Sequence, residues 1–296
     1  MKHFYSLLLF SFILSAATVS VAYSQILPER ERATLRDEIL KDRFDTLLPK
    51  LMDDTGIDMW LVIAREYNED PVMRTMLPAT WLNARRRTIL VFYRNKEQNT
   101  LERLAVARYD VGANITSSWD KEKQPNQWER LVEIIKERPV KKIGINISKH
   151  FGIADGLVQT DYQELMQALP SNLEEKIVSA EKLAIAWIET RTEKEMVLYN
   201  QLVDITSTII DQAFSAAVIT PGKTTTDDIV WWMRQKVTSL GLETWFHPTI
   251  DIQRNNEALQ SHIYSFTKGE KQKTVLPGDL LHCDFGITYI SLNTDC

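Results

Sequence analysis

The chain has 296 residues, enough for two domains at ~100–200 residues each. Hydrophobic residues make up 44% and charged residues 25%, which is ordinary for a globular protein and excludes extended disorder or a fibrous repeat. A formal charge of −5 argues against nucleic-acid binding, and two cysteines, Cys283 and Cys296, exclude a disulfide scaffold or a thiolate zinc cluster.

The first 24 residues have the pattern of a secretory signal. Lys2 and His3 precede an apolar run, Leu7–Leu14, and the segment ends in a small-x-small pattern that is typical of a cleavage site. The apolar run is shorter than the ~20 residues that a membrane span needs, although a single-span anchor is the alternative. We therefore predict cleavage near Gln25, a periplasmic or secreted protein, and no stable membrane insertion.

Residues 25–183 alternate between helical and strand-like patterns. Helical spacing of apolar residues covers 28–50, 127–138 and 156–169. Short apolar runs predict strands at 59–64, 88–93, 104–109, 142–147 and 176–180. Helices that alternate with short buried strands indicate an α/β domain.

Residues 184–296 have a different pattern, and we place a domain boundary near residue 183. Thr192 and Glu195 stand at capping-box spacing and open a long helix that extends to about Val218. A second helix is expected from Ile229 to Leu240, followed by strand-like sequence. Helices followed by strands predict an α+β arrangement here.

Two acidic residues near the carboxyl end carry the strongest chemical signal. Asp284 lies inside an apolar strand, Leu280–Phe285, where a lone carboxylate is costly, and Asp295 follows eleven residues later. A turn centred at Tyr289 and Ile290 would place the two acids directly opposite, with Cβ atoms ~4.5–5.5 Å apart. Two divalent metals ~3.5–4 Å apart would fit between them. The alternative is a pair of solvated turn residues.

Four segments follow one another along the chain: 188–195, with a charged helix start; 219–228, with Pro-Gly-x-Thr-x-x-Asp; 246–250, with Phe-His-Pro-Thr-Ile; and 277–295, with the two acids. Residues 184–296 thereby resemble the catalytic domain of the creatinase/prolidase/methionine aminopeptidase family, the pita-bread metallopeptidases. Residues 26–180 resemble the amino-terminal domain of the prolidase and Xaa-Pro aminopeptidase members.

The resemblance implies a creatinase-like amino-terminal domain followed by an incomplete pita-bread catalytic domain. It implies a metal-dependent aminopeptidase that releases an amino-terminal residue from a peptide, before proline. Two divalent ions (Mn, Zn or Co) would be held with Asp284 chelating one and Asp295 bridging both. His262 would be a catalytic histidine that binds substrate rather than metal, with His247 as its competitor. A homodimer of the full-length protein is compatible with this family.

The chain departs from the family where it ends. Family members continue beyond the second aspartate and supply a histidine and two glutamates as further ligands, whereas here Cys296 follows Asp295 directly. We therefore expect the chain to be a fragment that is inactive as given. Two other functions stay open: a non-catalytic peptide-binding relative of the same fold, and a creatinase-like amidinohydrolase that acts on small molecules.

Overall fold

The computed structural model describes residues 26–254 and 273–296. Contacts divide the chain into an amino-terminal unit, residues 28–200 with 288–292, and a carboxy-terminal unit made up mainly of residues 201–287 and 293–296. The signal segment and His262 lie outside the described residues, and the boundary near residue 183 stays a prediction. Within the described ranges, no helix combines the length and the apolar character that a bilayer crossing requires.

The amino-terminal unit is built on one mixed sheet of six strands in the order β4-β3-β2-β1-β5-β6. Its strands are β1 (Met59–Arg65), β2 (Arg87–Asn95), β3 (Thr100–Val106), β4 (Thr116–Ser117), β5 (Ile143–Ile145) and β6 (Ile177–Ser179). Its helices are α2 (Glu29–Asp42), the π-helix η1 (Arg43–Leu47), α3 (Leu48–Thr55), α4 (Pro71–Met76), α5 (Gln127–Lys136), the 3₁₀ turn η2 (Gly152–Ala154), α6 (Gln159–Ala168), α7 (Ser171–Glu174) and α8 (Glu181–Glu189). The expected α/β architecture of this region is therefore present.

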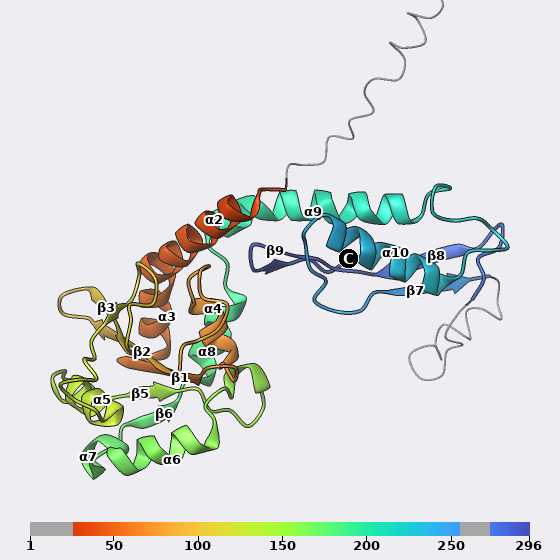
Figure 1. The fold of residues 1–296 in the computed structure, drawn as a ribbon. Coiled ribbons are helices and arrows are strands. Elements are labelled where there is room, and N and C mark those ends of the chain that lie inside the picture. Colours follow the sequence, from red (N-terminus) through yellow and green to blue (C-terminus); the bar gives the residue numbers. More distant parts are fainter. Residues whose placement is uncertain (1–25, 255–272) are drawn as a thin grey trace, which may run out of the picture. The chain divides into compact units, whose positions relative to one another are not determined.

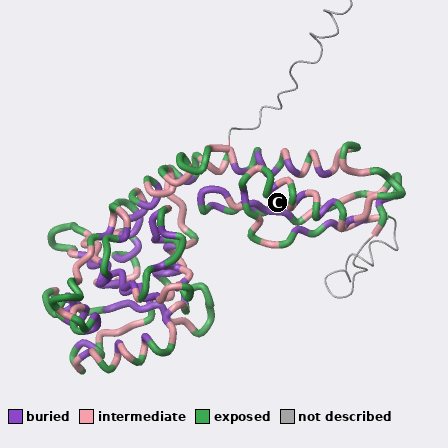
Figure 2. Tube along the Cα trace, in the orientation of Figure 1, coloured by how far each residue is buried: buried purple, intermediate pink, exposed green. Residues whose placement is uncertain are grey.

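The two central strands are buried on both faces, which explains why their sequences are continuously apolar. Along β1, Trp60 and Val62 belong to one core, which includes side chains of η1, α3, α4 and α8. Leu61 and Ile63 belong to the second core, which includes side chains of α5, α6 and α7. Helices thus cover both faces of the sheet (Figure 1), and the buried positions concentrate along its central strands (Figure 2). The result is a three-layer arrangement with two cores.

The third strand begins and ends earlier than the sequence indicates. We expected residues 104–109, but β3 runs from Thr100 to Val106 and pairs antiparallel with β2. The mostly polar segment 100–103 belongs to the ladder because this part of β3 is exposed or half-buried and tolerates polar side chains. Beyond it, the carbonyl oxygen of Ala107 accepts a hydrogen bond from the Ser117 hydroxyl instead of a ladder partner. Arg108 and Tyr109 are therefore free of the sheet and exposed.

A buried ion pair joins η1 to the start of the next long helix, α9 (Glu193–Ala213). The Arg43 guanidinium donates to both carboxylate oxygens of Glu195, at 2.9 and 2.8 Å, and to the carbonyl oxygens of Trp187 and Thr190. It also lies 4.4 Å from the centroid of the Trp187 ring. The predicted capping box is present. The Glu195 carboxylate accepts from the Thr192 backbone N–H, and the Thr192 hydroxyl oxygen accepts from the Glu195 backbone N–H.

The carboxy-terminal unit has helices on two short sheets, as expected for an α+β region. α9 is followed by α10 (Thr226–Ser239), which begins with a capping box formed by Thr225 and Asp228. Strands β7 (Thr249–Gln253) and β8 (Leu280–Asp284) pair antiparallel. The chain closes with a hairpin of β9 (Thr288–Tyr289) and β10 (Leu292–Asn293), whose residues 288–292 are grouped with the amino-terminal unit.

Candidate functional site

The β7–β8 sheet has one exposed face that ends at Asp284. Exposure alternates along β8, so that Leu280, His282 and Asp284 are exposed and the intervening Leu281 and Cys283 are half-buried. This alternation confirms that His282 and Asp284 share a face and that Cys283 faces the other way. The exposed position of Asp284 also removes the desolvation cost that we expected for a carboxylate within this apolar strand.

The closing hairpin turns one residue later than the sequence indicates. Ile290 and Ser291 both have positive φ, 52° and 62°, and form the turn between β9 and β10. Phe285 and Cys296 exchange two backbone hydrogen bonds of 3.0 Å, so these residues are directly opposite. Asp295 therefore faces Gly286, and our prediction of a direct Asp284–Asp295 pair is wrong. In this register the two acids are diagonal neighbours, a relation that places Cβ atoms ~7–8 Å apart or somewhat closer.

Gly286 separates the two acids and has no room for a side chain. A Cβ atom at this position would lie 2.6 Å from the Trp245 Nε1 atom and 2.9 Å from Phe246, and it would overlap the Thr294 carbonyl oxygen. The space is filled because the Trp245 indole N–H donates to that carbonyl oxygen at 2.8 Å. Glycine is thus required here by close approach.

The residue before Asp295 is fixed by both its backbone and its side chain. The hydroxyl oxygens of Thr294 and Thr206, on α9, lie 2.8 Å apart, and both residues are buried. Thr206 also donates to the Leu202 carbonyl oxygen, and Thr294 Oγ1 accepts from the Ile287 N–H at 3.1 Å. These contacts connect the hairpin to α9, so Asp295 is presented from an ordered backbone.

Both acids carry carboxylates that the protein leaves unneutralised. Asp284 and Asp295 are exposed, and within the described ranges neither forms an ion pair or a side-chain hydrogen bond. Carboxylate oxygens suit Mn²⁺ and are also accepted by zinc, so this pair fits part of a divalent-metal site. Among the described residues there is no cluster of three or more acidic, histidine or cysteine ligands.

The histidines occupy different positions relative to these acids. His262 lies outside the described residues, so its predicted role stays untested. His247 is exposed and makes an edge contact with Trp231, with ring centroids 5.6 Å apart. His282 stands opposite Asp251 on the face that ends at Asp284. Of the described histidines, His282 is the one on the same face as a predicted metal ligand.

The turn that precedes β8 is fixed by an ion pair. The Arg254 guanidinium donates to both oxygens of Asp279, at 2.7 and 3.0 Å, and to the Thr274 carbonyl oxygen at 2.6 Å. Asp279 also accepts from the Leu276 N–H. Arg254 lowers the pKa of Asp279, and Asp279 raises the pKa of Arg254 in turn. The Pro-Gly-Asp turn therefore places the first residue of β8 by means of a bidentate pair.

Sequence reasoning missed the residues that hold the site in place. Trp245, Thr206 and Thr294 are ordinary packing residues by composition, and their hydrogen bonds join positions 49 and 88 residues apart. One signal was available: Asp284-Phe285-Gly286 contains a glycine directly after a strand, which commonly marks close approach of another backbone. That signal indicates a close neighbour without identifying it.

Solved structures similar to this chain share one fold. An Xaa-Pro dipeptidase from Bacillus anthracis is 17% identical with a TM-score of 0.50, covering 89% of this chain and 63% of that one. Escherichia coli aminopeptidase P with the inhibitor Pro-Leu is 11% identical with a TM-score of 0.52, covering 92% and 62%. A single-residue variant of the same aminopeptidase gives a TM-score of 0.54 at 11% identity.

At these low identities, the similarities show a shared fold only. No family model and no curated protein matches the sequence. This chain spans about three fifths of the length of the matched structures, 62–63% of each. The predicted fold class, a creatinase-like amino-terminal domain followed by a pita-bread domain, is confirmed by these neighbours.

Proposed function

We propose that the protein is a metal-dependent aminopeptidase that releases the residue preceding a proline. Two observations support the proposal. The fold matches structures of an Xaa-Pro dipeptidase and an aminopeptidase P. Within that fold, one hairpin carries two exposed carboxylates, Asp284 and Asp295, that have no cation of the described chain beside them.

The hairpin is the observation that carries the proposal. Glu195 is buried and paired with Arg43, whereas Asp284 and Asp295 have no cation of the described chain as partner and stand beside a tightly fixed backbone. The two carboxylates are diagonal neighbours across the hairpin, and their like charges repel each other unless a cation lies between them. An arrangement that keeps such a cost is expected where the carboxylates hold an exogenous cation.

In the proposed reaction, Asp284 and Asp295 would hold two divalent ions (Mn, Zn or Co). Such ions polarise the scissile carbonyl and make water a nucleophile near neutral pH. The protein's part is positional: Gly286 lets the two hairpin arms approach, and the Thr206–Thr294 contact keeps Asp295 in place. A bond before proline is a tertiary amide, so a peptide substrate is distinguished at that bond by its missing N–H.

The test uses protein expressed from the complete reading frame. We expect Mn²⁺, Zn²⁺ or Co²⁺ to support release of the first residue from Xaa-Pro peptides, with less release from matched Xaa-Ala peptides and none from creatine. Asp284→Asn and Asp295→Asn should each lower the metal content measured by mass spectrometry and reduce turnover by orders of magnitude. His262→Ala should lower turnover while the metal content stays unchanged.

Asp204→Asn is the matched control, because Asp204 is also an exposed acid of this unit, on α9. It should leave metal content and turnover unchanged. Full metal content and activity in both Asp284→Asn and Asp295→Asn would exclude the hairpin as the site. If the protein binds peptides but cleaves none of them with Mn²⁺, Zn²⁺ or Co²⁺, the non-catalytic peptide-binding function is favoured instead. Hydrolysis of creatine would favour the amidinohydrolase.

A further inference from the structure

A small cavity in the amino-terminal unit lies where β2 begins and β3 ends. Its volume is about 190 Å³, and its lining consists of arginines, aromatic residues and two others: Trp81, Arg85, Arg86, Arg87, Ala107, Arg108, Tyr109, Trp119 and Gln127. The lining includes four arginines, and no acidic residue of the described chain is part of it. A cavity with this lining has a positive potential unless other residues neutralise the arginines.

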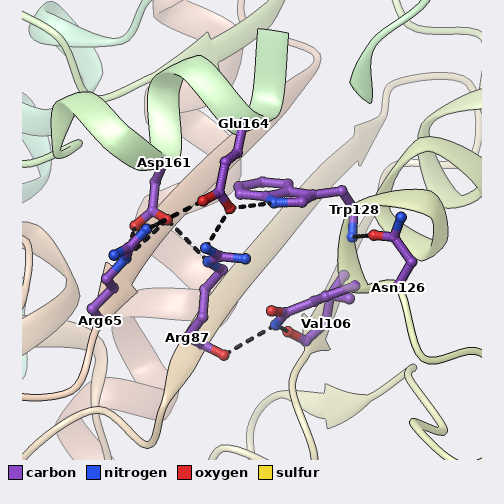
Figure 3. A network of polar contacts seen from close by, with 8 residues as sticks. Arg65, Arg87, Val106, Asn126, Trp128, Asp161 and Glu164 are labelled. Atoms are coloured by element: carbon purple, nitrogen blue, oxygen red, sulfur yellow. Dashed lines mark hydrogen bonds and ion pairs between the residues drawn. The ribbon is translucent and has the colours of Figure 1, made fainter. Parts of the chain in front are cut away.

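Two of the four arginines are neutralised by acids outside the cavity. Arg87 donates to Asp161 at 2.9 Å and also to Glu164, and Arg65 shares the same acids (Figure 3). A hydrogen bond from the Trp128 indole N–H lowers the pKa of Glu164, and the charge of Arg87 lowers it further. Arg86 pairs with Glu66 at 3.2 Å. Neither of these two arginines has its charge available to a ligand.

The other two arginines, Arg85 and Arg108, have no acidic partner. Within the described ranges, neither guanidinium forms an ion pair or a side-chain hydrogen bond. Arg85 instead lies 4.7 Å from the Trp81 ring centroid and 5.6 Å from that of Tyr109. Two aromatic rings lie beside this guanidinium, and its N–H groups have no acceptor among the described residues, although the side chain is exposed to water.

The backbone here accepts an unfavourable conformation that separates Arg85 from Arg87. Arg86 has a positive φ of 58°, a region that costs ~1–3 kcal/mol for a residue other than glycine. Glu66 stabilises it, because its carboxylate accepts from the Arg86 N–H and its own N–H donates to the Arg86 carbonyl oxygen. These arginines are thereby directed to different partners: Arg87 to Asp161 and Glu164, and Arg85 to the aromatic rings.

We propose that this cavity binds a small organic oxyanion, a carboxylate or phosphate attached to a planar group. The N–H groups of Arg85 and Arg108 would bind the oxyanion, since guanidinium groups match carboxylate and phosphate geometry. Trp81, Tyr109 and Trp119 would contact the planar group. The volume of 190 Å³ is below the ~300–1,000 Å³ typical of drug-sized ligands, so the ligand is small. This site is independent of the proposed peptidase activity.

Calorimetric titration of the full chain with four probes tests the proposal. Benzoate and phenyl phosphate should bind at least about tenfold more tightly than benzamide, which has the planar group without the charge. Phenyl phosphate should also bind more tightly than inorganic phosphate, which has the charge without the planar group. The ratio of benzoate to phenyl phosphate affinity identifies which oxyanion the site prefers.

Substitutions identify the cavity as the binding site. Arg85→Gln and Arg108→Gln should each weaken benzoate binding about tenfold or more, and Arg85→Lys should weaken it less than Arg85→Gln. Arg86→Gln is the matched control, because Arg86 lines the same cavity but is paired with Glu66. Unchanged thermal unfolding shows that each variant is folded.

Three results would overturn the proposal: no binding of either anionic probe, benzamide binding as tight as benzoate, or Arg86→Gln weakening binding as much as Arg85→Gln. Equal affinity for inorganic phosphate and phenyl phosphate would also overturn it, because the aromatic walls would then play no part. Each readout is a binding constant, so failure of the peptidase assay has no bearing on these results.

Discussion

Two pairs of acidic side chains in this protein have opposite surroundings. In the amino-terminal unit, Asp161 and Glu195 are buried and each is bonded to arginine. In the carboxy-terminal unit, Asp284 and Asp295 are exposed and have no cation of the described chain beside them. The comparison teaches that pairing, more than position in a strand, separates an acid that supports the fold from an acid that is available to a ligand. Removing the first kind should cost stability, and removing the second should not.

The largest stability effect is expected from Glu195→Ala. The substitution leaves the Arg43 guanidinium buried without its carboxylate, and breaking a buried pair in this way costs ~3–5 kcal/mol. Urea unfolding followed by circular dichroism measures the loss. Glu193→Ala, two residues away and exposed on the same helix, should change the unfolding free energy by less than ~0.5 kcal/mol. Equal losses of unfolding free energy in the two variants would contradict the distinction between buried, paired acids and exposed ones.

Gly286→Ala is expected to have the next largest effect. The new Cβ would meet Trp245 and the Thr294 carbonyl oxygen, and forced overpacking of this kind costs ~1–3 kcal/mol. Because the two hairpin arms must separate to relieve the contact, metal binding at Asp284 and Asp295 should weaken as well. Gly152→Ala is the control, since a Cβ there has no atom within 4 Å. A Gly286→Ala variant with unchanged stability and metal affinity would contradict the close approach.

Asp70→Asn tests a buried acid of the amino-terminal unit that is bonded without an arginine. Asp70 caps α4 through the N–H groups of Val72 and Met73, and its other oxygen accepts from the Asn146 side-chain NH₂ at 2.9 Å. In the variant, an amide NH₂ faces the Asn146 NH₂, so one buried donor loses its acceptor, at a cost of ~1–3 kcal/mol. Thermal unfolding at pH 7 measures this; an unchanged midpoint would show that the network rearranges freely.

The pH dependence of stability should differ between Asp70, in the amino-terminal unit, and Asp279, in the carboxy-terminal unit. Their surroundings shift the two pKa values in opposite directions. Burial raises the pKa of Asp70, so its contribution to stability is largest below its unfolded pKa and is lost as the pH rises through the raised value. Arg254 lowers the pKa of Asp279, so that contribution is present above the unfolded pKa and is lost as the pH falls through the lowered value. Arg254→Gln should therefore reduce stability at neutral pH and flatten its decline in acid.

The smallest effect on stability is expected for Asp284→Asn and Asp295→Asn, the variants for which the proposed function predicts the largest loss of activity. Asp284→Asn and Asp295→Asn remove exposed carboxylates that stabilise no neighbour, so the metal-free unfolding free energy should stay within ~0.5 kcal/mol of the parent value or rise slightly. The same samples titrated with Mn²⁺ should show weaker metal-induced stabilisation than the parent chain. A large loss of metal-free stability in either variant would show that the acid supports the fold, as Asp161 and Glu195 do.

The sequence allowed prediction of the elements whose pattern is local. The continuous apolar run at Met59–Ala64 gave the position of β1, and the Thr192–Glu195 spacing gave the start of α9 to within a residue. The capping role of Asp70 before Pro71 was predictable for the same reason. Each of these depends on residues within a few positions of one another, where steric and hydrogen-bonding preferences decide the outcome.

The parts that could not be predicted depend on distant residues or on a local preference that the fold overrides. The Arg43 partner, Glu195, is 152 residues away, and no periodicity indicates it. The predicted hairpin register was wrong by one residue, because the turn at Ile290 and Ser291 has positive φ at both positions without the Asn-Gly type of sequence that would mark it. Cross-strand bonds between Phe285 and Cys296, together with the Thr294 contact to α9, set the register instead.

The turn at Ile290 and Ser291 has a consequence for the order in which the protein assembles. Tight turns of this kind favour Asn-Gly, and a short hairpin lacking that sequence is not stable by itself in water. The hairpin therefore gains its register from α9, through Thr206 and Thr294, and the two acids reach their final separation only as the helix docks. In a chain still emerging from the ribosome, Asp284 and Asp295 are two independent carboxylates with little affinity for a cation. Capture of a metal at this hairpin would then report completed folding, and a nascent chain would not retain metal there.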